Sequence, residues 1–409
     1  REAARRCLKG CIRAMRDPAF WWYPESLVAR MLAPGAAIYG AIAEQRMAKP
    51  GASAGVPVIC IGNLTVGGAG KTPTALAVAA LLRSAGKNPF VLSRGYGGTL
   101  EGPVRVDAAR HRAADVGDEP LLIARTVPTV IARDRVSGAE AARAGGADVI
   151  VMDDGFQNPS LKKDLAIVVV DGRRGIGNGC VFPAGPLRAP LKPQLRRAHA
   201  VLVIGAPEGA GEIVSVAQAK GLPVFFGELE PDTAALAAIR GRPVLAFAGI
   251  GDPEKFFATL SSSGVDVVER FAFADHHRFS ASDARGLLAR AGTQGLQLVT
   301  TEKDRARMAG EPELMTLAAT VQTLPVTLKV AEADAFRDLV QTAGRAERVL
   351  HVGRRPAGRG NDVAPHEFAM AEELQGRGAD PDRQHPFSGL DAEAGAGFVH
   401  LFHRRFTRE

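Results

Sequence analysis

Residues 62–73, with the sequence GNLTVGGAGKTP, contain the residue types that bind the phosphates of a nucleotide. Their glycines let the backbone curl, so that successive N–H groups point at phosphate oxygens, and a helix that follows adds its positive N-terminus. Lys71 would reach the β- and γ-phosphates, and the hydroxyl of Thr72 would bind Mg²⁺. The spacing therefore predicts that the chain binds a nucleoside triphosphate.

One position departs from the general phosphate-loop pattern, which has glycine where this chain has Thr65. An ordinary glycine-rich turn is the alternative interpretation. The apolar β-branched run before the loop and the alanine- and leucine-rich segment after it favour the order strand, loop, helix instead. We expect the nucleotide to contact one continuous set of residues: Thr65, Gly67, Gly68, Ala69, Gly70, Lys71 and Thr72.

Two aspartates follow a second apolar run. Asp153 and Asp154 come directly after residues 147–152, which are typical of a buried strand. Carboxylates at the tip of such a strand, combined with a phosphate loop, form the acidic half of a Mg²⁺–nucleotide site. A helix cap or a turn would explain one aspartate more easily than two. We therefore expect Thr72, Asp153 and Asp154 to bind Mg²⁺.

Strands and helices must alternate along the chain to position these residues. Apolar runs that predict strands lie at residues 56–62, 88–93, 127–131, 147–152, 165–170 and 200–204. This alternation predicts an α/β fold of the P-loop NTPase kind, with a mostly parallel sheet flanked by helices. Arg94 and Tyr96 follow one of these strands at its carboxyl end, where parallel sheets bind their ligands. A glycine-rich turn with a solvated arginine is the alternative there.

Composition changes along the chain predict five segments. Residues 1–14 are basic and unpatterned and are expected to be an upstream extension, and residues 15–50 an interfacial helical segment. Residues 51–235 are expected to form the core domain, and residues 236–345 a smaller α/β domain. Residues 346–409 are dominated by Gly, Arg, Pro, Asp and Glu, which predicts a disordered tail.

The interfacial segment gathers both tryptophans and two of the three tyrosines within residues 20–47. Charged residues and Pro34 interrupt its apolar run, so we expect it not to span a bilayer. Aromatic and basic residues on an amphipathic helix suit the membrane interface, and a helix docked on the core is the alternative. The segment begins just after Met15, which we expect to be the natural start.

The overall composition narrows the possible partners. A net charge of +7 suits an anionic partner such as a nucleotide or an acidic membrane surface. Aromatic residues make up only 6%, which leaves few stacking platforms, so no nucleic-acid partner is expected. The four scattered cysteines favour a reducing compartment without a structural disulfide. Neighbouring His276 and His277 have no cysteine nearby, so a structural zinc site is not favoured.

Taken together, the motifs resemble the tetraacyldisaccharide 4′-kinases of lipid A synthesis. The matching stretches occur in the family's order, within residues 15–345, at 62–73, 93–97, 117–120, 153–157, 183–188, 275–276 and 301–304. Each stretch is weak alone, and the set is specific. Threonine at position 65 is itself typical of this family.

The resemblance implies an ATP-dependent, Mg²⁺-using lipid kinase. It would phosphorylate the 4′-hydroxyl of a tetraacyl glucosamine disaccharide 1-phosphate, as a peripheral protein on the cytoplasmic face of the bacterial inner membrane. Asp118 and His276 are implied to activate the sugar hydroxyl together, with Lys71 as a further catalytic residue. We expect four residues to bind the acceptor: Arg94, Tyr96, Arg135 and Arg188. Family members often have Glu where this chain has Ala189, so that contribution is absent or supplied elsewhere.

Two other classes of function remain open. One is a GTPase-type switch or assembly factor at the membrane surface, and the other is a nucleotide-regulated membrane-binding module. Guanine-binding motifs need Asn or Thr, then Lys, one spacer and Asp, and residues 301–304 place the lysine one position late. A binding module needs no base beside the γ-phosphate. Asp118 therefore argues against such a module, but only if the role that the resemblance implies for it is correct. A kinase requires its acceptor for nucleotide turnover, whereas a switch hydrolyses slowly without it.

Overall fold

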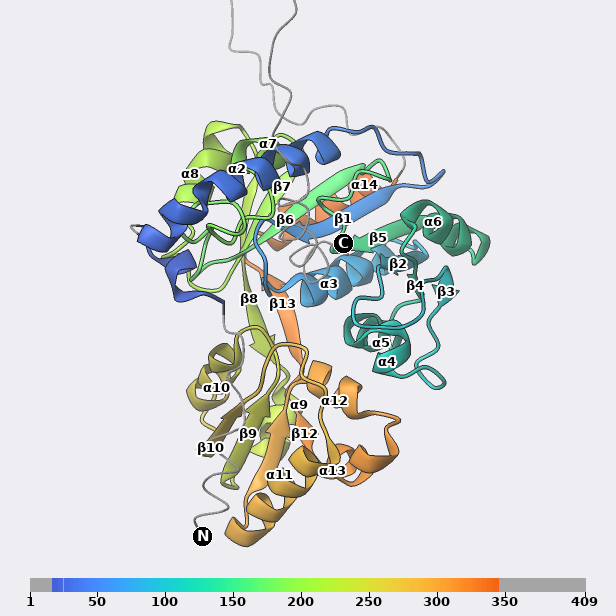
Figure 1. Ribbon diagram of the computed structural model, residues 1–409. Helices are drawn as coiled ribbons and strands as arrows, with labels where there is room; N and C mark the ends of the chain where they lie inside the picture. The colour runs from blue at the N-terminus through green and yellow to red at the C-terminus, as the bar shows by residue number, and fades with distance from the viewer. Residues whose placement is uncertain (1–16, 25, 346–409) are drawn as a thin grey trace, which may run out of the picture. The chain divides into compact units, whose positions relative to one another are not determined.

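The computed structural model describes residues 17–24 and 26–345 (Figure 1). The predicted extension at residues 1–14, the predicted start at Met15 and the predicted tail at residues 346–409 lie outside the described residues.

A large sheet of nine strands has the order β13-β8-β7-β6-β1-β5-β2-β4-β3. Its strands are β1 (Val58–Asn63), β2 (Pro89–Ser93), β3 (Val104–Arg105), β4 (Thr129–Ile131), β5 (Val149–Asp153), β6 (Leu165–Asp171), β7 (Ala200–Ile204), β8 (Val224–Pro231) and β13 (Val326–Val330). All pairs from β8 to β4 are parallel, and the edge strands β13 and β3 are antiparallel. The predicted α/β fold with a mostly parallel sheet is confirmed. Strand β1 has β5 on one side and β6 on the other, so its carboxyl end is the expected ligand position.

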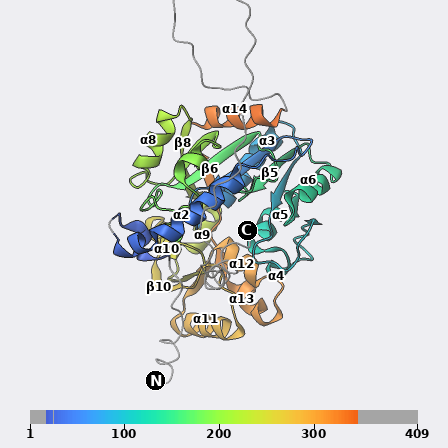
Figure 2. The same cartoon turned by 45° about the horizontal axis from the view of Figure 1, so that its top comes forward.

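Strand β1 is buried along its whole length because alternate side chains enter two different cores. Val58 and Cys60 belong to one core, and Ile59 and Ile61 belong to the other. The first core is covered by α2 (Leu27–Met47), α6 (Arg135–Ala144), α7 (Leu191–Leu195) and α8 (Gly211–Ala219). The second is covered by α3 (Lys71–Ser84), α5 (Asp118–Ala124) and α14 (Ala333–Gly344). In Figure 2, α2 lies diagonally across the large sheet.

A second, parallel sheet has the order β10-β9-β11-β12. Its strands are β9 (Val244–Ala248), β10 (Val267–Ala272), β11 (Gln297–Thr300) and β12 (Gln322–Thr323). Helices α9 (Thr233–Ile239) and α10 (Pro253–Ser262) share a core with one face, and α11 (Ala281–Gln294) and α13 (Met315–Thr320) share a core with the other. The remaining helical elements are η1 (Ala19–Trp22), α4 (Ala113–Val116), α12 (Glu302–Met308) and η2 (Pro312–Leu314).

The last strand and helix were expected in the smaller domain, but they belong to the large sheet. Strand β13 pairs with β8, and Phe336 and Val340 of α14 pack in the same core as α3. These buried apolar side chains give both elements a place on the large sheet that the order of the chain does not reveal. The other predicted domain limits stay a prediction.

Helix α2 runs without a break through Pro34, although this proline interrupts the apolar run in the sequence. A proline inside a helix costs about 3 kcal/mol. Buried residues on both sides of it, Ala29 and Ala36, hold the helix against the rest of the chain. By length and composition alone, the helix could cross a membrane. Of the 18-residue apolar stretch on which this rests, 17% is buried. Core helices and signal sequences pass the same test.

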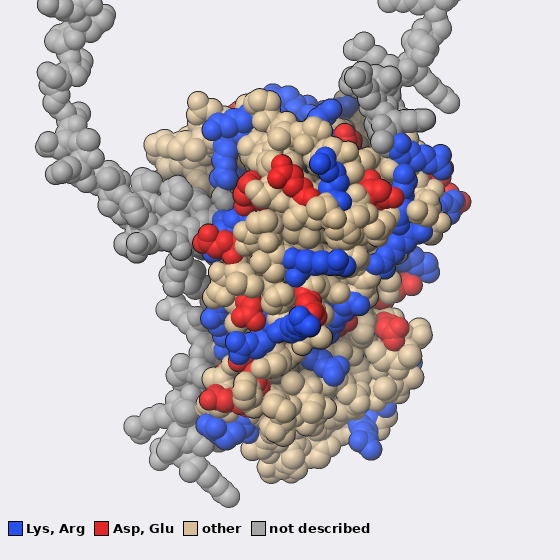
Figure 3. Space-filling model, turned by 90° about the vertical axis from the view of Figure 1, so that its right-hand side faces the viewer, with Lys and Arg blue, Asp and Glu red and all other residues tan. Residues whose placement is uncertain are grey.

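Charged side chains are mixed on the face shown in Figure 3. Lys and Arg alternate with Asp and Glu over the described part of this face. The excess positive charge of the chain is therefore not collected into one patch there.

Candidate active site

The phosphate loop joins the carboxyl end of β1 to the start of α3, as the sequence predicts. Gly67 and Gly70 have φ angles of 102° and 89°, which residues other than glycine rarely adopt. A Cβ atom on Gly70 would also lie 2.7 Å from the side chain of Ile204. The hydroxyl of Thr74 donates to the Gly70 carbonyl at 2.9 Å. These contacts hold the N-terminus of α3 at the edge of the sheet where an anion would bind.

Thr65 has extended backbone rather than a tight turn, because it forms a β-bridge with Leu187. On either side, the Val66 N–H donates to Pro186 and the Arg188 N–H donates to Leu64, both at 2.8 Å. The loop is therefore fixed to residues 183–188. This pairing explains why threonine replaces the glycine of the general pattern.

Asp154 is held by two basic residues. Its two carboxylate oxygens accept hydrogen bonds from Arg188 at 2.9 and 3.1 Å, and the Lys71 ammonium lies 3.6 Å away. Burial raises the pKa of Asp154, but the charges of Arg188 and Lys71 lower it well below its ordinary value. Arg188, expected to bind substrate, is thus paired with a predicted metal ligand in this structure.

Asp153 has the opposite environment. It is 1% exposed, and neither carboxylate oxygen has a hydrogen-bond partner among the described residues. Burial, with the nearby charges of Glu119 and Asp154, raises its pKa to about 7. A buried carboxylate without a donor fits a divalent cation, which would supply the missing positive charge.

The described residues contain no cluster of three or more potential metal ligands. Mg²⁺ needs fewer from the protein, because phosphates and water complete its six oxygen ligands. Thr72, the second residue of α3, is 3% exposed. The set of Thr72, Asp153 and Asp154 therefore fits the partial coordination that a Mg²⁺–nucleotide needs.

The raised pKa of Asp153 predicts a pH-dependent stability in metal-free buffer. Because the folded protein binds this proton more tightly than the unfolded chain, wild-type stability falls as the pH rises from about 4 to about 7. Asp153→Asn removes that loss. In EDTA at pH 8, its melting temperature should exceed that of the wild type by on the order of 2–5 °C, with little difference at pH 4.

Thermal unfolding at both pH values measures this effect. Asp266→Asn is the matched control because Asp266 is exposed and loses the same charge. An equal gain in that variant at pH 8 would contradict the assignment to Asp153.

Asp118, at the start of α5, and His276, in the turn after β10, meet at one oxygen. Asp118 is the first residue of α5 and is 5% exposed, and the Nδ1 atom of His276 lies 3.4 Å from its Oδ2. Burial raises the pKa of Asp118, but the hydrogen bond with His276 and the charge of Arg307 lower it well below its ordinary value. Burial lowers the pKa of His276, and Asp118 with Asp275 raises it above its ordinary value. The pair thus favours an ionised carboxylate beside a protonated imidazole.

Sequence reasoning missed Arg307, which lies in α12 and is bound to the same oxygen. Its Nε donates to Asp118 Oδ2 at 2.7 Å, and its Nη1 donates to Asp304 Oδ1 at 2.8 Å. Nearby, Lys303 donates to Glu119 at 2.5 Å. The spacing of three residues between Asp304 and Arg307 on a helix was the available signal. That spacing indicates an ion pair between Asp304 and Arg307, but it does not identify Asp118 as the third partner.

The other predicted substrate residues differ in placement. Tyr96 is 56% exposed, and its ring meets that of His276 edge-on with centroids 5.3 Å apart. Arg94 follows the carboxyl end of β2. Arg135 is only 3% exposed and donates to the Ala132 carbonyl, and burial together with the charge of Arg94 lowers its pKa to about 10. A substrate contact by Arg135 therefore needs movement of its surroundings.

The comparisons with known proteins agree on one family. The family model described as tetraacyldisaccharide-1-P 4′-kinase (LpxK) matches residues 28–345. The tetraacyldisaccharide 4′-kinase of Nitrobacter winogradskyi is 54% identical over 326 residues, covering 80% of this chain and 97% of the relative. That of Methylobacterium sp. strain 4-46 is 58% identical over 322 residues, covering 78% and 95%. This chain belongs to the tetraacyldisaccharide-1-P 4′-kinase family.

A solved structure of a tetraacyldisaccharide-1-P 4′-kinase supports the same assignment. LpxK from Aquifex aeolicus, crystallised in complex with ATP, is 26% identical, with a TM-score of 0.61, and the match covers 78% of this chain and 99% of that one. The family match spans every candidate residue described above. The resemblance drawn from the motifs is therefore confirmed, and the roles of the individual site residues stay predictions.

Proposed function

We propose that this chain transfers the γ-phosphate of ATP to the 4′-hydroxyl of a tetraacyl glucosamine disaccharide 1-phosphate, a step of lipid A biosynthesis. The observation that carries the proposal is family membership over residues 28–345. A carboxylate–histidine pair beside a phosphate loop supports it. A switch without an acceptor has no use for that pair, so this alternative is not favoured.

The residues of the chain divide the work as follows. The loop N–H groups and Lys71 would bind the phosphates, and Asp153, Asp154 and Thr72 would hold Mg²⁺. Mg²⁺, when bound, supplies neutralising charge for the transferring phosphoryl group. Asp118 then accepts the proton of the sugar hydroxyl.

The lowered pKa of Asp118 makes it a weak base, and this suits the reaction. Phosphoryl transfer is largely dissociative in most analyses, so the enzyme contributes mainly positioning and charge stabilisation. Arg307 and His276 both contact Oδ2 of Asp118 and so fix the orientation of the carboxylate. Because the pKa of His276 is raised, the imidazolium orients the base rather than competing for the proton.

An assay with purified protein, ATP and the disaccharide 1-phosphate tests the proposal. We expect acceptor-dependent ADP release and a product phosphorylated at the 4′ position. Slow hydrolysis at the same rate with and without the acceptor would indicate a nucleotide switch instead.

We further propose that the protein acts as a peripheral enzyme on the cytoplasmic face of the inner membrane. An acylated acceptor is held in a bilayer, and α2 exposes a set of large apolar side chains: Leu27, Val28, Met31, Ile38 and Ile42. Their exposure supports an interfacial role, since soluble surfaces rarely gather so many.

A double variant tests the membrane role of α2. Met31→Ser with Ile38→Ser removes side chains that are 82% and 65% exposed, so the fold should stay intact. We expect at least a tenfold loss of binding to lipid vesicles and lower activity on the acylated acceptor, with ATP affinity unchanged, because each buried CH₂ contributes about 0.8 kcal/mol. The control is Val268→Ser with Met315→Ser, at 52% and 64% exposure. Equal losses of vesicle binding in both variants would show that α2 is not the part of the protein that contacts the membrane.

A further inference from the structure

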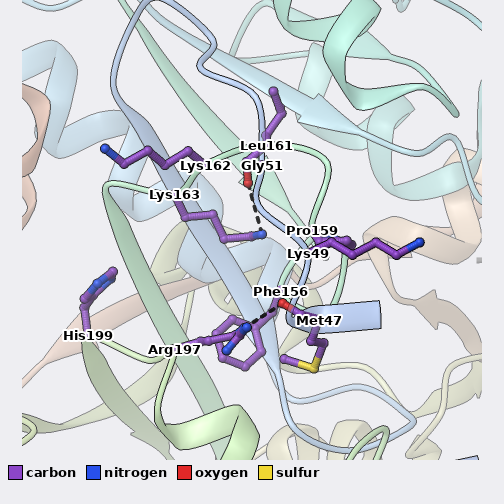
Figure 4. Close-up of a pocket in the computed structure, with 10 residues that line it drawn as sticks. All are labelled: Met47, Lys49, Gly51, Phe156, Pro159, Leu161, Lys162, Lys163, Arg197 and His199. Atoms are coloured by element: carbon purple, nitrogen blue, oxygen red, sulfur yellow. Dashed lines mark hydrogen bonds between the residues drawn. The ribbon is translucent and has the colours of Figure 1, made fainter. Parts of the chain in front are cut away.

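A separate hollow of about 240 Å³ lies away from the phosphate loop (Figure 4). Much of its lining comes from three segments that lead into β1, β6 and β7 at their amino ends. These include Lys49, Lys162 and Arg197. The phosphate loop follows β1 at its carboxyl end, so the length of that six-residue strand, roughly 17 Å, lies between the two. The hollow shares no residue with the active site described above.

The charge of this hollow is one-sided. Its lining contains Lys49, Lys162, Lys163, Arg197 and His199, and no aspartate or glutamate. Within residues 17–24 and 26–345, none of its lysine or arginine side chains has a carboxylate partner. The neighbouring Arg196, outside the lining, pairs with Glu44 at 2.9 Å. In this part of the chain, no ion pair therefore involves a lysine or arginine of the lining.

Two of these cations are held in place by backbone carbonyls. Arg197 donates through Nε to the Met47 carbonyl at 2.8 Å, which fixes the guanidinium plane. Lys163 donates to the carbonyls of Asn158 and Leu161 at 2.5 and 3.4 Å. Figure 4 shows both side chains directed toward the middle of the set, whereas the ends of Lys49 and Lys162 extend outward on opposite sides. Such a pre-ordered guanidinium and ammonium loses little entropy when an anion binds.

His199 adds a further donor at the rim. Its Nδ1 accepts the Ala166 N–H at 2.8 Å, so a neutral ring carries its proton on Nε2. Burial lowers the pKa of Lys163, and the charges of Arg197 and Arg135 lower it further. The charge of Asp164 acts on His199, so the excess positive charge of the hollow rests on its lysine and arginine side chains.

We propose that this hollow binds a phosphate-bearing anion. Phosphate oxygens match the two-pronged guanidinium and the point charges of lysine. The anion has two possible sources: the headgroup of an anionic phospholipid, because Met47 at the end of α2 forms one wall, or a free phosphate ester.

The test compares two variants that each lose two positive charges. Lys162→Gln with Arg197→Gln changes the hollow. Lys192→Gln with Lys220→Gln changes exposed residues of α7 and at the end of α8, outside both the hollow and α2. General attraction to an anionic surface would weaken equally in both, since it depends on charge near the surface. A built site predicts that only the first variant loses affinity, by at least tenfold.

Two measurements distinguish the sources. Sedimentation with vesicles of phosphatidylglycerol in phosphatidylcholine reports a headgroup, and calorimetric titration with glycerol 1-phosphate reports a free ester. In the titration, any binding of the ester to the phosphate loop is the same for the wild type, the hollow variant and the control variant. Loss confined to the hollow variant supports the proposal in either assay and identifies the source. Equal behaviour of the two variants in both assays overturns it.

Folding controls accompany both assays. Melting temperature and ATP affinity should be unchanged, because neither variant touches the active site. If Arg197→Gln unfolds through loss of its bond to Met47, Lys49→Gln with Lys162→Gln replaces it. Both of these lysines are exposed. The same two outcomes then decide the question.

Discussion

Lys71→Ala is expected to reduce phosphoryl transfer by on the order of 10³-fold or more, because this reaction depends on positioning and charge neutralisation. Lys71 is the first residue of α3, and its ammonium lies 3.6 Å from Asp154, a predicted metal ligand. Removing it leaves Asp154 with both hydrogen bonds from Arg188. The fold should therefore survive, with a melting temperature close to that of the wild type.

Acceptor-dependent ADP release measures this effect, and ATP binding by calorimetry shows where the loss falls. Lys220→Ala is the control because Lys220 is exposed and lies at the end of α8. Near-normal turnover in the Lys71 variant would contradict the assignment of residues 62–73 as the phosphate-binding loop.

Asp118→Asn and His276→Asn should each lower kcat by on the order of 10²-fold, the usual scale for acid–base groups. Their contact at Asp118 Oδ2 makes them one unit. Once the carboxylate is gone, His276 has no base to orient. The double variant should then lose little beyond the worse single variant.

A double-mutant cycle on kcat tests this coupling. His277→Asn is the matched control, because His277 bonds to Asp283 at 3.1 Å and takes no part in the contact with Asp118. Fully multiplicative losses in the double variant would show that Asp118 and His276 act independently.

The large sheet was predictable because its strands are continuous apolar runs that follow each other in the chain. Parallel strands buried on both faces need such runs, and the ligand edge follows from their direction. The last strand was placed in the wrong unit. Its pairing with β8 joins residues about a hundred positions apart, and no local pattern contains that information.

The candidate site shows the same limit at the level of single side chains. Asp153 and Asp154 are neighbours at the end of β5 and were indistinguishable by sequence. The structure separates them because Arg188 reaches only Asp154, while burial leaves Asp153 without a donor. Arg307 was missed for a related reason, since its partner Asp118 lies 189 residues away. Motifs identify which residue types are present, and only packing decides which of them touch.

The antiparallel pairing of β8 with β13 also bears on how such a gene is built. Pro231 and Val326 are register partners on these two strands, so the stretch between them leaves the large sheet and returns to it at one point. A short hairpin turn between Pro231 and Val326 could replace residues 232–325 without changing the order of the strands in the large sheet. The shortened chain would keep Lys71, Asp118 and Asp153 but lose His276 and Arg307. The phosphate loop and the predicted base Asp118 thus belong to the surrounding sequence, whereas the two side chains that contact Asp118 are carried by an inserted segment.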